Sequence, residues 1–170
     1  MMKQMMQDES RRTALDRMRY TKNTRSSSLA LLSIVFNVLY FVSIYASDVG
    51  SWYYTILIGG SIVYNLLFML MAFLASEGVK NYKLGYSYLL LFLGAGQIVR
   101  MGYLPVKAHA ATVTISKVAY QVMGDGQFAY VLACLALSAA CAIAAGVVGV
   151  KRSKTLAAYN AALEVEKKTA

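Results

Sequence analysis

The sequence predicts an all-α integral membrane protein, a four-transmembrane-helix bundle with both its N-terminus and its C-terminus in the cytoplasm. Three observations lead to this fold class. The chain of 170 residues is 58% hydrophobic and 15% charged, which is too apolar for an ordinary soluble domain. Four runs are long enough to cross a bilayer, which takes roughly 20 apolar residues per helix. The basic residues gather on one side of these runs.

The four predicted spans cover about residues 28–46, 52–76, 84–104 and 128–150. Together they form a transmembrane domain over residues 28–150. A basic amphipathic cytoplasmic tail precedes it at residues 1–27, and a basic cytoplasmic helix follows it at residues 151–170. The outer loop, residues 105–127, contains a stretch rich in β-branched residues at 112–122, which suggests a small β-hairpin with its turn near Ser116 and Lys117.

The distribution of lysine and arginine predicts the orientation. Fourteen of the 17 lie in the two tails and in the connection after span two, whereas the outer loop holds Lys107 and Lys117. An excess of basic residues marks the cytoplasmic side of a membrane protein. Some of them are expected to contact anionic lipid headgroups of the inner leaflet, namely Arg11, Arg12, Arg17, Arg19, Arg25, Lys151 and Arg152. The N-terminal tail has two other interpretations, a solvated basic tail or a segment that binds a protein partner.

The membrane is expected to be a bacterial inner membrane. The last five residues, Glu166-Lys167-Lys168-Thr169-Ala170, match the dilysine pattern of endoplasmic reticulum retrieval, but so short a match in a lysine-rich tail is weak. Because the basic residues flank spans and do not form one docking face, nucleic acid is not an expected partner. The expected partners are membrane lipids and another membrane protein or a second copy of the chain.

Spans one and two contain similar nine-residue motifs. The stretches Ser33-Ile-Val-Phe-Asn-Val-Leu-Tyr-Phe41 and Ser61-Ile-Val-Tyr-Asn-Leu-Leu-Phe-Met69 share five of nine residues. The repeat places Asn37 and Asn65 near mid-membrane on opposed helices. An amide in hydrocarbon needs a hydrogen-bond partner, so each asparagine is expected to clamp the other. A polar lining for a solute, or chance similarity of two apolar helices, are the alternatives.

Span four is rich in small residues. Ser138, Ala142 and Gly146 lie four apart, and small residues at this spacing let helix backbones approach closely. This face predicts tight helix packing, either against the other three spans or against another subunit.

Arg100 interrupts the apolar run of span three, one turn after Gln97. On the predicted boundaries it lies roughly 6 Å below Leu104 at about 1.5 Å per residue. It can extend to the outer headgroups, pair with Asp48 or Asp125 at the outer side, or help to bind an anionic ligand. Asn37, Asn65, Gln97 and Arg100 form the predicted polar membrane network.

The sequence offers little that indicates catalysis. The predicted spans contain no aspartate, glutamate or lysine, and no spacing of histidine and cysteine is typical of a metal site, so no cofactor, metal or enzymatic activity is expected. The leading hypothesis is a non-catalytic accessory or structural subunit that associates with a larger membrane complex such as a transporter. The alternative is a small solute permease or channel that acts as a homo-oligomer.

Overall fold

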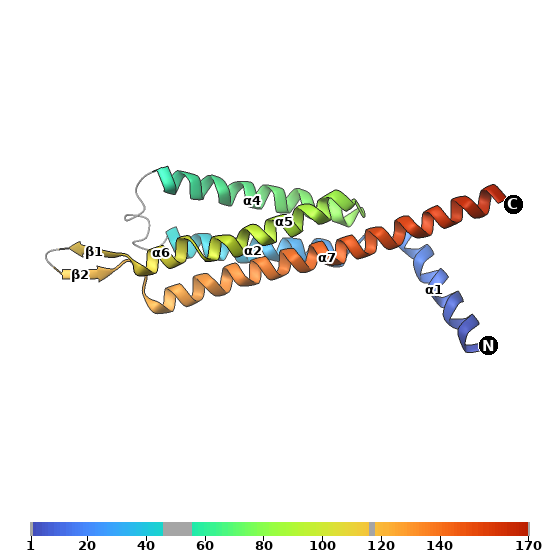
Figure 1. Ribbon diagram of the computed structural model, residues 1–170, viewed down its shortest axis with the longest axis horizontal. Coiled ribbons are helices and arrows are strands. Elements are labelled where there is room, and N and C mark those ends of the chain that lie inside the picture. Colours follow the sequence, from blue (N-terminus) through green and yellow to red (C-terminus); the bar gives the residue numbers. More distant parts are fainter. Residues whose placement is uncertain (1, 46–55, 116–117, 170) are drawn as a thin grey trace.

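The computed structural model describes residues 2–45, 56–115 and 118–169, which are almost entirely helical (Figure 1). The helices are α1 (Met2–Tyr20), α2 (Thr24–Tyr45), α4 (Ile56–Lys80), α5 (Leu84–Met101), α6 (Leu104–Ala110) and α7 (Asp125–Thr169), and the strands are β1 (Thr112–Ile115) and β2 (Val118–Gln121). The chain is therefore an all-α bundle, as its hydrophobic pattern predicts.

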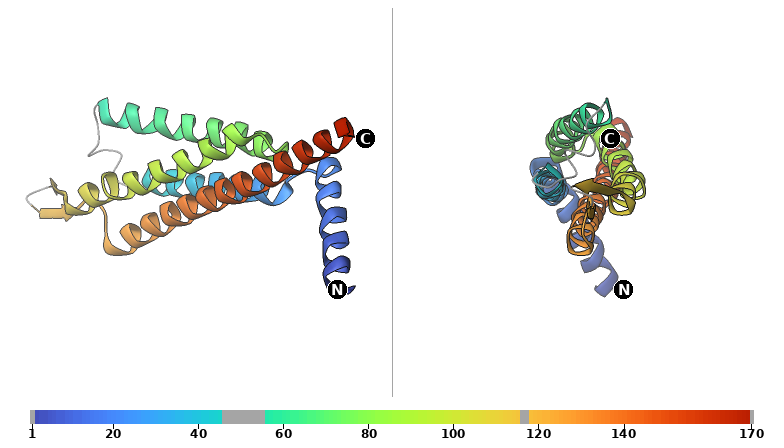
Figure 2. Two further views of the ribbon diagram at one scale, coloured as in Figure 1. Left: turned by 45° about the vertical axis from the view of Figure 1, so that its right-hand side comes forward. Right: turned by 90° about the vertical axis from the view of Figure 1, so that its left-hand side faces the viewer.

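Four helical stretches of the described residues are long and apolar enough to cross a membrane: α2, α4, α5 continued by α6, and α7. In a bilayer such helices satisfy their own backbone hydrogen bonds. Helix α7 packs most extensively against α5 and α2, whereas α4 packs against α2 and α5 and has few contacts with α7 (Figure 2). These features are those of a multi-pass membrane protein.

The outside of the bundle is apolar. Large exposed hydrophobic side chains occur on each of the four helices, and an apolar surface this extensive marks contact with lipid or with another protein. They include Val35 and Val42 on α2, Leu66, Leu70 and Phe73 on α4, Phe92 and Val99 on α5, and Leu137 and Val147 on α7. The amide side chains of Asn37, Asn65 and Gln97, in contrast, are buried inside the bundle.

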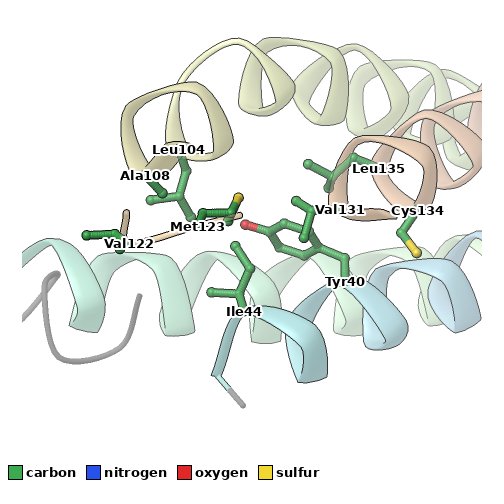
Figure 3. Packing of buried hydrophobic residues seen from close by; sticks show 9 residues of the cluster. All are labelled: Tyr40, Ile44, Leu104, Ala108, Val122, Met123, Val131, Cys134 and Leu135. Carbon is green, nitrogen blue, oxygen red and sulfur yellow. The ribbon is translucent and has the colours of Figure 1, made fainter. Parts of the chain in front are cut away.

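The hydrophobic core is divided along the length of the bundle. One cluster joins α2, α6, α7 and the segment after β2, and Figure 3 shows how its side chains meet around the ring of Tyr40. Its buried members are Tyr40, Ile44, Leu104, Ala108, Val122, Met123, Val131, Cys134 and Leu135. A second cluster lies toward the other end of the bundle, where Ala30, Ala75, Val79, Leu90 and Ala145 are all fully buried.

Small residues bring α5 and α7 into close contact. A Cβ atom on Gly146 would lie 2.7 Å from Cγ of Leu91 and 2.9 Å from the backbone oxygen of Ser87. A Cβ on Gly94 would lie 2.5 Å from Cγ1 of Ile143. Real side chains do not tolerate such distances without a shift, so glycine at these positions sets how near the two helices lie.

Two serines join α2 to α7. The Ser33 hydroxyl donates to the backbone oxygen of Ser138, and the Ser138 hydroxyl donates to the backbone oxygen of Ser33, each at 2.9 Å. Both residues are fully buried. This reciprocal pair satisfies two hydroxyls inside the bundle, where unpaired polar groups are costly.

Asn23 ties three helices together at one end of the bundle. It precedes α2, its backbone N–H donates to the last residue of α4, Lys80, at 2.9 Å, and its Oδ1 accepts from Nη1 of Arg152 on α7 at 3.1 Å. We call this end of the bundle the basic end. The opposite end, which carries β1 and β2, is the hairpin end.

Both α1 and the last part of α7 extend beyond the basic end (Figure 1). Residues 151–169 continue α7 without a break, whereas the sequence predicts a span that ends at residue 150 and a separate helix after it. The reason is composition, because residues 150–169 contain neither proline nor glycine and are rich in alanine, leucine, glutamate and lysine. Helix α1 leaves the bundle at a steep angle to its axis (Figure 2).

The hairpin end contains a helix where the sequence indicated only a loop. Helix α6 begins directly after Tyr103, with Pro105 in its first turn, where the missing N–H of proline breaks no hydrogen bond. Strands β1 and β2 pair antiparallel, with Thr112 opposite Gln121. The predicted turn at Ser116 and Lys117 lies outside the described residues, as does the connection 46–55.

Candidate functional site

Arg100 turns into the bundle, where it meets polar groups of two other helices. It lies near the end of α5, and its Nη1 donates to Oδ1 of Asn65 on α4 at 2.8 Å and to Oδ1 of Asn37 on α2 at 3.5 Å. Its Nη2 donates to the Ser61 hydroxyl oxygen at 3.4 Å. The guanidinium therefore connects α5 to α2 and α4 by hydrogen bonds.

Gln97 extends this network by one turn of α5. Its Nε2 donates to Oδ1 of Asn37 at 2.9 Å. The amide of Asn65 donates to the backbone oxygen of Ser61 at 2.9 Å, so its own oxygen is left to accept from Arg100. Asn37, Asn65 and Gln97 are fully buried. We call Asn37, Ser61, Asn65, Gln97 and Arg100 the polar cluster.

Two tyrosine rings surround the charge of Arg100. The guanidinium carbon lies 4.3 Å from the ring centroid of Tyr40 on α2 and 4.9 Å from that of Tyr64 on α4. An aromatic face within about 6 Å attracts a cation through its quadrupole. The rings therefore lower the cost of holding a positive charge inside the bundle.

Arg100 uses contacts inside the bundle in place of the extension to the outer headgroups that the sequence also allowed. Its guanidinium points to the side-chain oxygens of Asn37 and Asn65. The apolar stretch that carries it does not end at Pro105, because α6 follows α5 after Gly102 and Tyr103 and continues to Ala110.

The asparagines of the repeated motif do not form the direct clamp that the sequence suggested. No hydrogen bond joins the side chains of Asn37 and Asn65 among the described residues, and Arg100 donates to both. The physical reason is charge, because a hydrogen bond from an ionised donor is about twice as strong as one between neutral groups.

Two buried polar atoms of the cluster have no partner within the described residues: Nδ2 of Asn37 and Oε1 of Gln97. Exchanging the two ends of both amides would only change which donor and which acceptor are left over. Each unsatisfied group costs about 1 to 3 kcal/mol. The cluster therefore retains one unused donor and one unused acceptor.

Asp125, a predicted partner of Arg100, lies elsewhere. Its Oδ1 is 2.9 Å from Nε2 of His109 on α6, and the histidine ring lies 4.4 Å from that of Phe128. Asp125 is the first residue of α7, at the hairpin end, and its side chain is 93% exposed. Its contact with His109 is therefore on the surface. The other predicted partner, Asp48, lies outside the described residues.

The small face of span four is internal. Ser138, Ala142 and Gly146 are buried in the bundle, with Ser138 against α2 and Gly146 against α5. This face is therefore occupied by the chain's own helices.

The basic residues expected to contact lipid fall into two regions. Arg11, Arg12, Arg17 and Arg19 are exposed along α1, whereas Arg25, Lys151 and Arg152 lie near Asn23 at the basic end. Among the residues that the structure describes, no group of three or more histidine, cysteine, aspartate or glutamate side chains is placed to hold a metal ion.

Comparisons of the chain with protein-family models, with curated proteins and with solved structures find no match. The class of the protein is thus defined by its fold and its composition. It is a four-helix, multi-pass membrane protein with a polar cluster inside its bundle.

Sequence reasoning missed three members of this site: Ser61, Tyr40 and Tyr64. The signal was present in the repeat, because Ser61 opens the second motif and Tyr64 precedes its asparagine, while Tyr40 lies one turn after the first asparagine. A tyrosine in an apolar run does not by itself indicate a cation nearby, so the sequence left both rings out of the predicted network.

Proposed function

We propose that the protein is a non-catalytic accessory subunit that associates with a larger membrane assembly such as a transporter. The observation that carries this proposal is the pair of helices that leave the bundle at its basic end, α1 and residues 154–169 of α7 (Figure 1). We call this pair the arm. Such a projection adds little to the packing of the bundle and offers a surface to a partner.

A groove between the two helices of the arm supports the same proposal. Its apolar lining is made of Leu15 from α1 and Tyr159, Ala162 and Leu163 from α7. Charged side chains line the same groove, namely Asp8, Glu9, Arg11, Arg12 and Glu166. Protein interfaces likewise combine apolar and polar surface.

The proposal includes an orientation. We place the basic end and the arm in the cytoplasm of a bacterial cell and the β-hairpin on the outer side of its inner membrane, because basic residues are retained on the cytoplasmic side. Single cysteines test it after Cys134 and Cys141 are replaced by alanine. An impermeant thiol reagent should label Thr114→Cys, but not Lys167→Cys, from outside. Labelling of Lys167→Cys in intact cells would refute the orientation.

The partner is tested by purifying the tagged protein from its native membrane in mild detergent and measuring the native mass of the complex. We expect a different membrane protein in fixed stoichiometry. Leu163→Asp should release it, because the charge enters the apolar lining of the groove. Val165→Asp is the matched control, since Val165 is 63% exposed on the same helix and does not line the groove. A pure homo-oligomer in the native mass would contradict an accessory role.

The polar cluster favours a second candidate, a small permease or channel that works as a homo-oligomer. An intramembrane cation beside an unused amide donor and an unused acceptor is the kind of site that recognises a polar solute. Flux into liposomes of the purified protein should then fall in Asn37→Leu and Arg100→Ala. Flux should persist in Val99→Ala, whose side chain is 75% exposed beside the cluster. Unchanged flux in the cluster variants would eliminate this candidate.

A further inference from the structure

The basic end gathers cations that are far apart in the sequence. Asn23 holds the start of α2, the end of α4 and the middle of α7 at one level, through its bonds to Lys80 and Arg152. Lys22 and Arg25 lie at the start of α2, Lys83 directly precedes α5, and Lys151 is next to Arg152 within α7. We call Lys22, Arg25, Lys80, Lys83, Lys151 and Arg152 the basic collar.

Most of the basic collar is not neutralised by the chain itself. Lys80 pairs with Glu77 at 3.0 Å, and Arg152 donates to the neutral amide of Asn23. The other four cations are exposed and form no ion pair within the described residues. Like charges gathered at one end of a bundle repel one another, so an anion that binds among them stabilises the folded chain.

Apolar surface begins directly beside the basic collar. Exposed Leu31 and Leu32 follow it on α2, Phe73 and Leu74 precede it on α4, and Tyr86 and Tyr88 follow it on α5. Tyrosine with its ring against hydrocarbon and its hydroxyl toward water is typical of the level of lipid headgroups. A ligand that fits both surfaces has an anionic head and acyl chains.

We propose that the basic collar binds anionic phospholipids of the adjacent leaflet, with their phosphates between Lys22, Arg25, Lys83 and Lys151 and their acyl chains on the apolar faces of α2, α4 and α5. A soluble polyanion would match the charges and leave those apolar faces uncovered. The proposal does not depend on a protein partner, since the collar lies on the bundle and the groove lies on the arm.

The test is native mass spectrometry of the full chain in detergent with added phosphatidylglycerol or with phosphatidylcholine of the same acyl chains. We expect about a tenfold preference for phosphatidylglycerol, which corresponds to about 1.4 kcal/mol. The preference should decline at high salt, because exposed charges are screened. The variant Lys22→Gln/Arg25→Gln/Lys83→Gln/Lys151→Gln should lose it.

A matched control removes four charges from the arm: Arg11→Gln/Arg12→Gln/Lys167→Gln/Lys168→Gln. This control should keep the preference for phosphatidylglycerol. Equal binding of both lipids by the wild-type chain would overturn the proposal, as would equal loss in the control variant. Displacement of the lipid by glycerol phosphate or by RNA at equal concentration would overturn it too, because either result would show that the acyl chains contribute nothing. The salt dependence of the wild-type chain decides the matter if the collar variant does not fold.

Discussion

At the scale of single residues, Arg100 is the side chain on which the interior depends most. Its guanidinium donates to oxygens of Asn65, Asn37 and Ser61 and lies against two tyrosine rings. A hydrogen bond to a charged group contributes about 1.5 to 3 kcal/mol. The loss of Arg100 also leaves the buried amide oxygen of Asn65 without its donor, whereas that of Asn37 still accepts from Gln97.

We expect Arg100→Ala to lower the free energy of unfolding by about 2 to 4 kcal/mol, since it removes charged hydrogen bonds and leaves the buried oxygen of Asn65 unpaired. Asp125→Ala should have little effect, because its carboxylate is exposed at a surface contact with His109. The two effects should add in the double variant, measured by thermal or denaturant unfolding in detergent, because residues without shared partners act independently. Strong coupling would mean that Asp125 reaches Arg100 after all.

The role of Arg100 shows where sequence reasoning stops. Four polar residues interrupt the apolar runs, so these members of the network can be recognised from the sequence: Asn37, Asn65, Gln97 and Arg100. Which of them bond to which depends on the neighbours of each helix and on the direction of one flexible side chain. A repeat of two asparagines suggests that their amides bond to each other. In the structure the guanidinium of Arg100 instead donates hydrogen bonds to both amide oxygens.

At the scale of helices, the spans could be located because hydrophobic length is a local property. Their ends could not, because they depend on contacts. The sequence predicts a loop from Pro105, yet Pro105 lies in the first turn of α6, which is held in the bundle by burial of Leu104 and Ala108. Likewise, nothing in residues 151–169 marks a break, and only the structure shows that this part continues α7 past the basic end.

The contact of α5 with α7 gives a prediction at this scale. Gly146→Ala should destabilise the protein by about 1 to 3 kcal/mol, although alanine favours helix, because its Cβ meets Leu91 and the backbone of Ser87. Gly85→Ala should stabilise it by up to about 1 kcal/mol, because a Cβ there meets nothing within 4 Å. Thermal unfolding of both variants checks the opposite signs. Stabilisation by Gly146→Ala would show that the two helices do not approach as closely as described.

At the scale of the whole molecule, the bundle and the arm are separate in their contacts. The buried residues of α7 end at Ser153, and the exposed Val165 belongs to the projecting part. A chain that ends after Leu156 should therefore keep the unfolding temperature of the full chain to within a few degrees. Circular dichroism melts in detergent measure it. A large loss of stability would mean that the arm is part of the folded core.

Helix α7 runs without interruption through 45 residues, so it is a rod of about 67 Å at about 1.5 Å per residue. One end of this rod carries Asp125 beside His109, and the other carries Leu163 in the groove of the arm. Its buried residues, from Val131 to Ser153, are held in the bundle. The direction in which the groove is presented is therefore set by the packing of the same helix inside the bundle.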